Sequence, residues 1–224
     1  MALPIKAFLF DLNGTMIDDM YYHNKAWFNI LNDDLGAGLN WEQVKSHMYG
    51  KNTELLIRIF GANKFSAAEM DGYSIEKEKR YQQEYRPLLK LIDGLDDFLV
   101  QAKEKNVLMG IGSAAIPFNI SFVLDGLDIR HFFKSIVSAD DVVDSKPDPE
   151  TYLKGAKELG VLPEECIVFE DAPKGVEAAM LAGMKTVVIT TMHEAHEFIA
   201  YTNVIAFIKD YAELEMDKLL NVNE

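Results

Sequence analysis

Residues 5–15 read Ile-Lys-Ala-Phe-Leu-Phe-Asp-Leu-Asn-Gly-Thr, and this stretch decides the fold. The run Ile5–Phe10 is short, apolar and not alternating, which is typical of a strand buried on both faces of a parallel sheet. Asp11 follows the run directly, and Asn13 and Gly14 then indicate a turn. Ligands of open parallel sheets bind beyond the carboxyl ends of the strands. The sequence therefore predicts that Asp11 lies at a ligand-binding edge.

Further short runs rich in Val, Ile and Phe alternate with segments of helical periodicity. The predicted strands are Val107–Gly112, Ser135–Ser138, Cys166–Phe169, Thr186–Thr190 and Val204–Ile208. The predicted helices are Leu95–Lys105, Pro117–Leu127, Glu150–Leu159 and Lys174–Ala182. This alternation predicts an α/β fold with a doubly wound, Rossmann-like parallel sheet. Before the helix at 150–159, we expect Asp148 as the N-cap and Pro149 in the first turn.

The alternation breaks once, between Phe10 and Val107, where the sequence indicates helices only. The helices expected there are Tyr22–Leu31, Trp41–His47, Thr53–Phe60 and Glu69–Tyr85. Ser66 and Glu69 have the spacing of a capping box at the start of the last one. We therefore predict an all-helical domain at residues 18–86, inserted into a core formed by residues 1–17 and 87–224.

The charge and the composition exclude several classes of function. The chain has 224 residues with 22 Lys plus Arg and 36 Asp plus Glu, so its formal charge is −14. Such a chain would repel a phosphate backbone, which argues against nucleic-acid binding. The single cysteine, Cys166, excludes a disulfide framework. Without a long apolar segment or a signal-peptide pattern, we expect a cytoplasmic monomer that does not enter a membrane.

Polar residues follow several of the predicted strands. Ser113 follows the strand at 107–112, Lys146 lies in the loop after 135–138, and Glu170 and Asp171 follow 166–169. Each alone has a plainer interpretation as a turn, cap or solvated loop residue. Together with Asp11 they would gather at one edge of the sheet. Three crowded carboxylates repel one another unless a cation lies among them, and such oxygen-rich sites suit Mg²⁺.

A set of motifs in chain order carries a family resemblance. The matching residues are Asp11-Leu12-Asn13-Gly14-Thr15, then Asp18, His23, Trp27, Ser113, Lys146-Pro147, Glu170-Asp171, Gly175 and Ala182-Gly183. The sequence resembles the haloacid-dehalogenase-like (HAD) phosphotransferases, specifically the β-phosphoglucomutase-like subgroup with a helical cap after the first strand. The resemblance covers essentially the whole chain, and it implies a HAD core with an inserted cap.

The resemblance also implies roles for the site residues. Asp11 would be a nucleophile that forms an aspartyl-phosphate. Ser113 and Lys146 would bind the remaining phosphoryl oxygens. The implied holders of Mg²⁺ are Asp11, Asn13 through its backbone carbonyl, Asp171, and Glu170 close by. The implied substrate is a small phosphorylated metabolite.

Asn13 departs from the family pattern, in which Asp normally stands two residues after the nucleophile as general acid and base. An amide cannot serve that way, and loss of such a group costs about 10² to 10⁴ in rate. Three explanations are open: an engineered change, a substrate with a good leaving group or its own proton-transfer group, or a binder with little turnover. His23 could replace the base, although a polar role on the helix surface is the simpler interpretation.

The cap departs from the mutase pattern as well. In the mutase, a basic residue three positions after a Gly grips a second phosphate. Three residues after Gly50 this chain has Thr53, and Lys51 is the only nearby substitute in that loop. We therefore expect a phosphatase acting on a substrate such as a sugar phosphate. A sugar phosphate mutase is the alternative, and a binder with little turnover is a further one.

Overall fold

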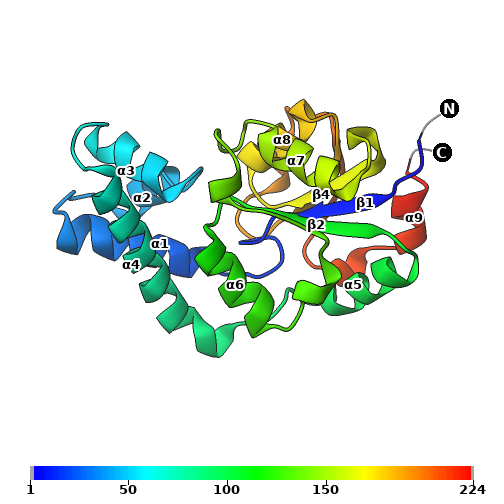
Figure 1. The fold of residues 1–224 in the computed structure, drawn as a ribbon, viewed down its shortest axis with the longest axis horizontal. Coiled ribbons are helices and arrows are strands. Elements are labelled where there is room, and N and C mark those ends of the chain that lie inside the picture. Colours follow the sequence, from blue (N-terminus) through cyan, green and yellow to red (C-terminus); the bar gives the residue numbers. More distant parts are fainter. Residues whose placement is uncertain (1–2, 223–224) are drawn as a thin grey trace. The chain divides into compact units, whose positions relative to one another are not determined.

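The computed structural model describes residues 3–222. It divides into two units, drawn in Figure 1. The core unit consists of the segment up to Asp18 and the segment from Lys90 onward, and the helical unit is Asp19–Leu89. The sequence predicts domain boundaries after residues 17 and 86, close to these positions. No helix within residues 3–222 is long and apolar enough to cross a membrane.

The core unit contains a six-stranded sheet in the order β3-β2-β1-β4-β5-β6, with every neighbouring pair parallel. Its strands are β1 (Ala7–Phe10), β2 (Leu108–Gly112), β3 (Ser135–Val137), β4 (Cys166–Glu170), β5 (Lys185–Ile189) and β6 (Val204–Ile208). This is the doubly wound arrangement that the sequence predicts, with all six strands within two residues of their expected ends. The strand order reverses between β1 and β4, which is where such sheets bind ligands.

Helices cover both faces of this sheet. They are α5 (Leu95–Glu104), α6 (Pro117–Gly126), α7 (Glu150–Leu159), α8 (Pro173–Leu181) and α9 (Met216–Leu220). Single 3₁₀ turns lie at Arg130–Phe132, Ala139–Asp141, Pro163–Glu165, Ala195–Phe198 and Tyr211–Glu213. Figure 1 shows α7 and α8 on one face and α5 and α9 on the other.

The core packing follows from the alternation of side chains in β1. Ala7 and Leu9 lie in one buried cluster with residues of α7 and α8. Phe8 and Phe10 point to the opposite face, where Phe10 stacks on Phe169 with ring centroids 4.6 Å apart. Because both faces are filled, β1 is fully buried. Its carboxyl end is therefore a rigid support for the residues that follow.

The predicted N-cap of α7 is wrong. Pro149 occupies the N-cap position, with a φ of −73° and a ψ of −5°, and it has no side-chain acceptor. Asp148 lies one residue earlier, and its Oδ1 accepts a hydrogen bond from the backbone N–H of Glu150 at 2.9 Å. The physical reason is the ring of Pro149, whose fixed φ already matches a helix.

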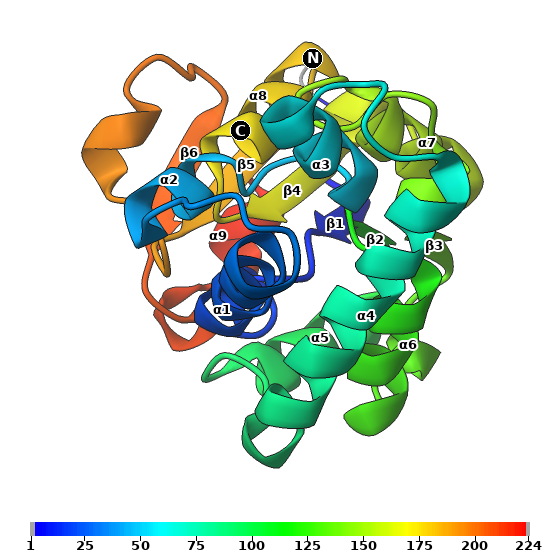
Figure 2. The same cartoon turned by 90° about the vertical axis from the view of Figure 1, so that its left-hand side faces the viewer.

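The helical unit consists of four α-helices and two short irregular turns. They are α1 (Met20–Asn29), a π-helical turn (Ile30–Asp34), α2 (Trp41–Ser46), α3 (Asn52–Phe60), α4 (Ala67–Tyr85) and a 3₁₀ turn (Arg86–Leu88). The α1 helix packs against α4 (Figure 2), and Trp27, Leu31 and Leu56 are buried in the centre of the unit. The predicted capping box is confirmed, because the backbone N–H groups of Ser66 and Glu69 each donate to the other residue's side chain.

Candidate active site

Two adjacent strands bring the first carboxylates together. Phe10 of β1 is in register with Phe169 of β4, so Asp11 and Glu170 lie side by side at the carboxyl ends of these strands. The backbone N–H of Asp11 continues the ladder by donating to the carbonyl of Phe169 at 2.9 Å. The side chain of Asp11 is only 12% exposed. The site thus lies at the point where the strand order of the sheet reverses.

Lys146 links these two carboxylates. Its Nζ lies 2.7 Å from Oδ1 of Asp11 and 2.8 Å from Oε1 of Glu170, and 4.6 Å from the centre of the Tyr152 ring. Burial by itself would lower the pKa of Lys146, but the charges of Asp11 and Glu170 outweigh it and raise the pKa to about 12. Lys146 therefore carries a permanent positive charge at a buried position.

Both oxygens of Glu170 are used within the protein. Oε1 also accepts from the Tyr152 hydroxyl at 3.0 Å, and Oε2 accepts from the backbone N–H groups of Asp171 and Ala172. Gly175 makes room for this carboxylate, because a Cβ atom there would overlap with Oε1 of Glu170. Glu170 is therefore a rigid partner for Lys146. Sequence reasoning missed Tyr152, which occupies the first turn of an ordinary amphipathic helix.

Asp171 is the third carboxylate, and it is 4% exposed. Its Oδ1 accepts a hydrogen bond from the Thr15 hydroxyl at 3.2 Å. Burial, followed by the charges of Glu170 and Asp11, raises the pKa of Asp171 well above its usual value. Gly14, with a φ of +80°, allows the close approach, since a Cβ at this position would overlap with Oδ2 of Asp171.

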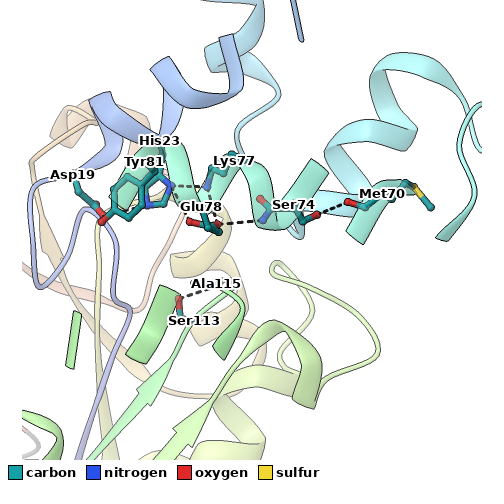
Figure 3. A network of polar contacts seen from close by, with 10 residues as sticks. Asp19, His23, Met70, Ser74, Lys77, Glu78, Tyr81, Ser113 and Ala115 are labelled. Carbon is teal, nitrogen blue, oxygen red and sulfur yellow. Dashed lines mark hydrogen bonds and ion pairs between the residues drawn. The ribbon is translucent and has the colours of Figure 1, made fainter. Parts of the chain in front are cut away.

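Ser113 follows β2, the other neighbour of β1, and it is 2% exposed. Its backbone N–H donates to the carbonyl of Val137, and its Oγ accepts from the backbone N–H of Ala115 at 3.1 Å, as Figure 3 shows. That contact uses the oxygen as an acceptor, so the hydroxyl proton is still available to a ligand. Asn13 lies in the turn after β1, where it forms an isolated bridge with Ile17.

The predicted cap residues lie around the start of α3. Gly50 has a φ of +73°, Lys51 is the N-cap residue of α3, and Thr53 is the second residue of that helix. Arg58 fixes the preceding loop: its guanidinium donates to the carbonyls of His47 and Tyr49 and stacks 3.8 Å from the centre of the Tyr49 ring. Arg58 was not foreseen, and these contacts commit it to holding the loop.

His23 belongs to a buried polar cluster within the helical unit, which we call the His23 cluster: Asp19, His23, Lys77, Glu78 and Tyr81. His23 is 4% exposed, and its Nε2 and Nδ1 lie 3.1 Å from Oδ2 of Asp19 and 2.5 Å from Nζ of Lys77 (Figure 3). The predicted alternative of a surface role is therefore excluded for His23 by its burial. Sequence reasoning missed Lys77 and Glu78 because they stand in a run of charges, Glu-Lys-Glu-Lys-Arg at 76–80, that reads as a solvated helix face.

Comparisons with known proteins agree with these observations. A family model described as haloacid dehalogenase-like hydrolase matches residues 8–189. The chain is 30% identical over 184 residues to fructose-1-phosphate phosphatase YqaB of Escherichia coli, covering 80% of this chain and 93% of that protein. It is 31% identical over 186 residues to beta-phosphoglucomutase of Bacillus subtilis, covering 80% of this chain and 81% of that protein.

A solved structure extends the likeness to the whole fold. A HAD hydrolase of family IA, variant 3, from Entamoeba histolytica superposes with a TM-score of 0.85 at 27% identity, covering 97% of this chain and 99% of that chain. The family match spans the loops that carry Asp11, Lys146 and Asp171. The resemblance inferred from the motifs is thereby confirmed: the chain belongs to the haloacid dehalogenase-like hydrolases, and its homologues include the β-phosphoglucomutase-like subgroup.

Proposed function

We propose that this protein is a Mg²⁺-dependent phosphatase of a small phosphorylated metabolite such as a sugar phosphate. The observation that carries the proposal is Lys146, held between Asp11 and Glu170 at the carboxyl ends of β1 and β4. A carboxylate can act as the nucleophile in phosphoryl transfer, and a fixed cation beside it can stabilise the charge on the transferring group. The similarity to a fructose-1-phosphate phosphatase supports the substrate class.

The proposed reaction uses the carboxylate of Asp11 twice. A carboxylate oxygen forms a bond to phosphorus while the bond from phosphorus to the ester oxygen breaks, which leaves an acyl phosphate on Asp11. Water then attacks this phosphorus, inorganic phosphate departs, and the carboxylate is restored. Lys146 stabilises the negative charge that accumulates on the phosphoryl oxygens, and the Ser113 hydroxyl donates a hydrogen bond to one of them.

The donor set fits Mg²⁺ in charge and in chemistry. When all three are ionised, Asp11, Glu170 and Asp171 bring three negative charges against the one positive charge of Lys146, and the raised pKa of Asp171 reflects this crowding, which a cation would relieve. Within residues 3–222, no three Asp, Glu, His or Cys side chains form a metal site by themselves. The ligands that the family resemblance implies are Asp11, Asp171 and the backbone carbonyl of Asn13, and these would hold the ion, with Glu170 occupied by Lys146. The bound ion would neutralise charge on the transferring phosphoryl group.

Asn13 determines how the leaving group obtains its proton. An amide has no proton to give to an alkoxide, so esters with a poor leaving group react slowly unless the proton comes from the substrate or from water. A substrate whose leaving group is itself a stable anion, such as acetyl phosphate, does not need that proton. Asn13 therefore predicts a chain that discriminates between substrates by their leaving group.

The first prediction tests both features by steady-state kinetics. Sugar phosphates and acetyl phosphate would be assayed with Mg²⁺ on the unaltered protein, on Asn13→Asp and on Asp11→Asn. We expect Asn13→Asp to raise the turnover of sugar phosphates about 10²-fold or more and that of acetyl phosphate much less. Asp11→Asn should abolish turnover in both cases. Retained activity in Asp11→Asn would contradict the covalent mechanism.

The same assay separates two other candidate functions. A sugar phosphate mutase, which the likeness to a beta-phosphoglucomutase brings into consideration, would form an isomeric hexose phosphate and require a bisphosphate activator. The commitment of Arg58 to the loop before α3 removes one candidate for a second phosphate grip. If the protein is a binder with little turnover, it should remain inactive after the Asn13→Asp substitution. If it is a phosphatase, the substitution should increase its activity.

A further inference from the structure

The turn after β1 is held by two residues that lie far away in the sequence. Thr191, in the loop after β5, donates from its hydroxyl to the carbonyl of Gly14 at 2.6 Å. Tyr211, in the 3₁₀ turn after β6, donates from its hydroxyl to the next carbonyl, that of Thr15, at 3.1 Å. All four residues belong to the core unit. Two consecutive carbonyls of one turn thus accept from side chains 177 and 196 residues further along the chain.

These contacts matter because the turn contains a residue with wide conformational freedom. Gly14 has a φ of +80°, and glycine adopts positive and negative φ about equally well. Within the turn, the N–H of Gly14 donates to the carbonyl of Ile17 at 2.8 Å, and the N–H of Met16 donates to that of Leu12 at 2.9 Å. A rotation about Gly14 would move its carbonyl away from the Thr191 hydroxyl. The hydrogen bond from Thr191 therefore favours the observed conformation.

The conformation of this turn determines where two of the implied Mg²⁺ ligands lie. The carbonyl of Asn13 and the N–H of Gly14 belong to the same planar peptide and point in opposite directions. The hydrogen bond from Gly14 to Ile17 therefore fixes the direction of the Asn13 carbonyl. Thr15 donates through its side chain to Oδ1 of Asp171, so a shift of its backbone would move the partner of that carboxylate. The turn is thus linked to both ligands.

Both hydroxyl groups come from well-fixed positions. Tyr211 is 2% exposed, and its ring lies against Phe169 of β4 with ring centroids 5.7 Å apart. Thr191 is anchored by the residue before it. The backbone N–H and the hydroxyl of Thr190 donate to the carbonyl of Ile208 in β6, at 2.9 Å and 3.1 Å. The sheet itself therefore sets the position of each donor.

We propose that Thr191 and Tyr211 are positioning residues that hold the turn after β1 in the conformation that binds Mg²⁺. They act through the backbone of the turn on two ligands, the carbonyl of Asn13 and the carboxylate of Asp171. This inference rests on the proposed Mg²⁺-dependent function. The loop after β5 would set the affinity for the metal through the fraction of molecules whose turn is ready to bind.

The first measurement needs neither metal nor substrate. Hydrogen exchange of peptides spanning residues 11–17 would be followed by mass spectrometry in the unaltered protein and in Thr191→Val. Without the hydroxyl the turn should open more often, so the amides of Gly14 and Met16 should exchange about three- to tenfold faster, the effect of one lost hydrogen bond. Thr191→Ser keeps a hydroxyl and should restore the original rate. Unchanged exchange in Thr191→Val would overturn the proposal.

The second measurement is the affinity for Mg²⁺. Calorimetric titration should give a Kd about three- to tenfold higher in Thr191→Val and in Tyr211→Phe than in the unaltered protein. Tyr211→Phe keeps the aromatic ring and removes only the hydroxyl. The loss of turnover in both variants should disappear as the Mg²⁺ concentration is raised, because the bound metal selects the same conformation of the turn. A turnover defect that persists at saturating Mg²⁺ would contradict the proposal.

Thr190→Val is the matched control. It removes a hydroxyl from the neighbouring residue, and the acceptor of that hydroxyl, the carbonyl of Ile208, keeps its hydrogen bond from the Thr190 N–H. Exchange of residues 11–17 and the Kd for Mg²⁺ should both be unchanged. If Thr190→Val has the same effects as Thr191→Val, the role assigned to the Thr191 hydroxyl is overturned. Thermal melting would verify that every variant is folded at the assay temperature.

The outcomes separate this inference from the proposed function. If the unaltered protein binds no Mg²⁺, the proposed function fails, and this inference fails with it. If it binds Mg²⁺ and Asn13→Asp hydrolyses phosphoesters, but Thr191→Val and Tyr211→Phe leave exchange and Kd unchanged, only this inference is overturned. Faster exchange at residues 11–17 together with a higher Kd, both restored in Thr191→Ser, would support it.

Discussion

At the scale of single residues, the candidate site depends on one carboxylate that does no chemistry of its own. Glu170 receives Lys146, Tyr152 and two backbone N–H groups, and it thereby fixes the ammonium that faces Asp11. Such positioning residues are sensitive to small displacements, because a shift of about 1 Å in a reacting group can cost about 10²-fold in rate. Gly175, whose Cα lies against Glu170, is the residue that permits this geometry.

Gly175→Ala is therefore expected to lower activity and stability together. Its added Cβ would push the carboxylate of Glu170 away from Lys146, and we expect kcat on the best substrate to fall about 10²-fold. Helical Ala is favoured over Gly by about 0.5–1 kcal/mol, but the displacement of a buried, ion-paired carboxylate outweighs this gain, so the melting temperature should fall as well. Glu177→Gln, on the exposed side of the same helix, is the control. Unaltered kcat in Gly175→Ala would show that Glu170 does not position Lys146.

The sequence was sufficient to predict that Asp11 and Glu170 lie side by side, because each stands at the carboxyl end of a strand and parallel strands share this edge. It was not sufficient to predict the contacts of Tyr152 and Thr15 or the burial of Glu78. Thr15 and Asp171 are 156 residues apart in the chain, and no local pattern encodes their contact. The burial of Glu78 was hidden for a different reason, since its neighbours along the helix are charged.

At the scale of elements, periodicity located every predicted strand and helix, whereas the exact ends depended on hydrogen bonds. The strand β1 begins at Ala7 and not at Ile5, although the carbonyl of Lys6 still accepts from Leu108. The N-cap of α7 was misassigned because Asp148 and Pro149 are both good residues for a helix start. Only the backbone geometry shows which of them occupies the cap position.

Two glycines within helices provide a matched test of packing at this scale. Around Gly72 in α4, an added Cβ would meet nothing within 4 Å, so Gly72→Ala should raise the free energy of unfolding by about 0.5–1 kcal/mol. Around Gly155 in α7, the Cβ would lie 3.0 Å from Cδ2 of Leu9. Gly155→Ala should therefore raise the free energy of unfolding by less, or lower it. Urea denaturation of both variants measures the difference. An equal rise in the free energy of unfolding for both variants would mean that Leu9 of β1 packs less tightly against Gly155 than described.

At the scale of the whole molecule, the core unit is interrupted in sequence by the helical unit. The phosphoryl-transfer groups all belong to the core unit, and the His23 cluster belongs to the helical unit. The charge of −14 makes the protein repel anions over long distances. The capture of a phosphate ester then depends on Lys146 and on the cation that the carboxylates of the site would hold.

Mg²⁺ should therefore slow hydrogen exchange in the core unit and leave exchange in the helical unit unchanged. A ligand stabilises the part of a protein that forms its site, by mass action. We expect 10 mM Mg²⁺, about the concentration of a saturating assay, to slow hydrogen exchange in β1, β4 and the loop after β4, with no change in α1–α4. Mass spectrometry of peptides after exchange would measure this effect. Asp171→Asn should remove the effect, and protection that persists in this variant would place the ion elsewhere.

The position of β1 also has a consequence for the order in which the chain folds during synthesis. The strand is apolar and buried, and its partners are β2 and β4. The helical unit is complete as soon as Leu89 has been made, whereas β1 obtains its second partner only after Glu170. A nascent chain thus exposes its first strand for most of translation. We expect the helical unit to fold on its own during this time, while the strand is still accessible to chaperones.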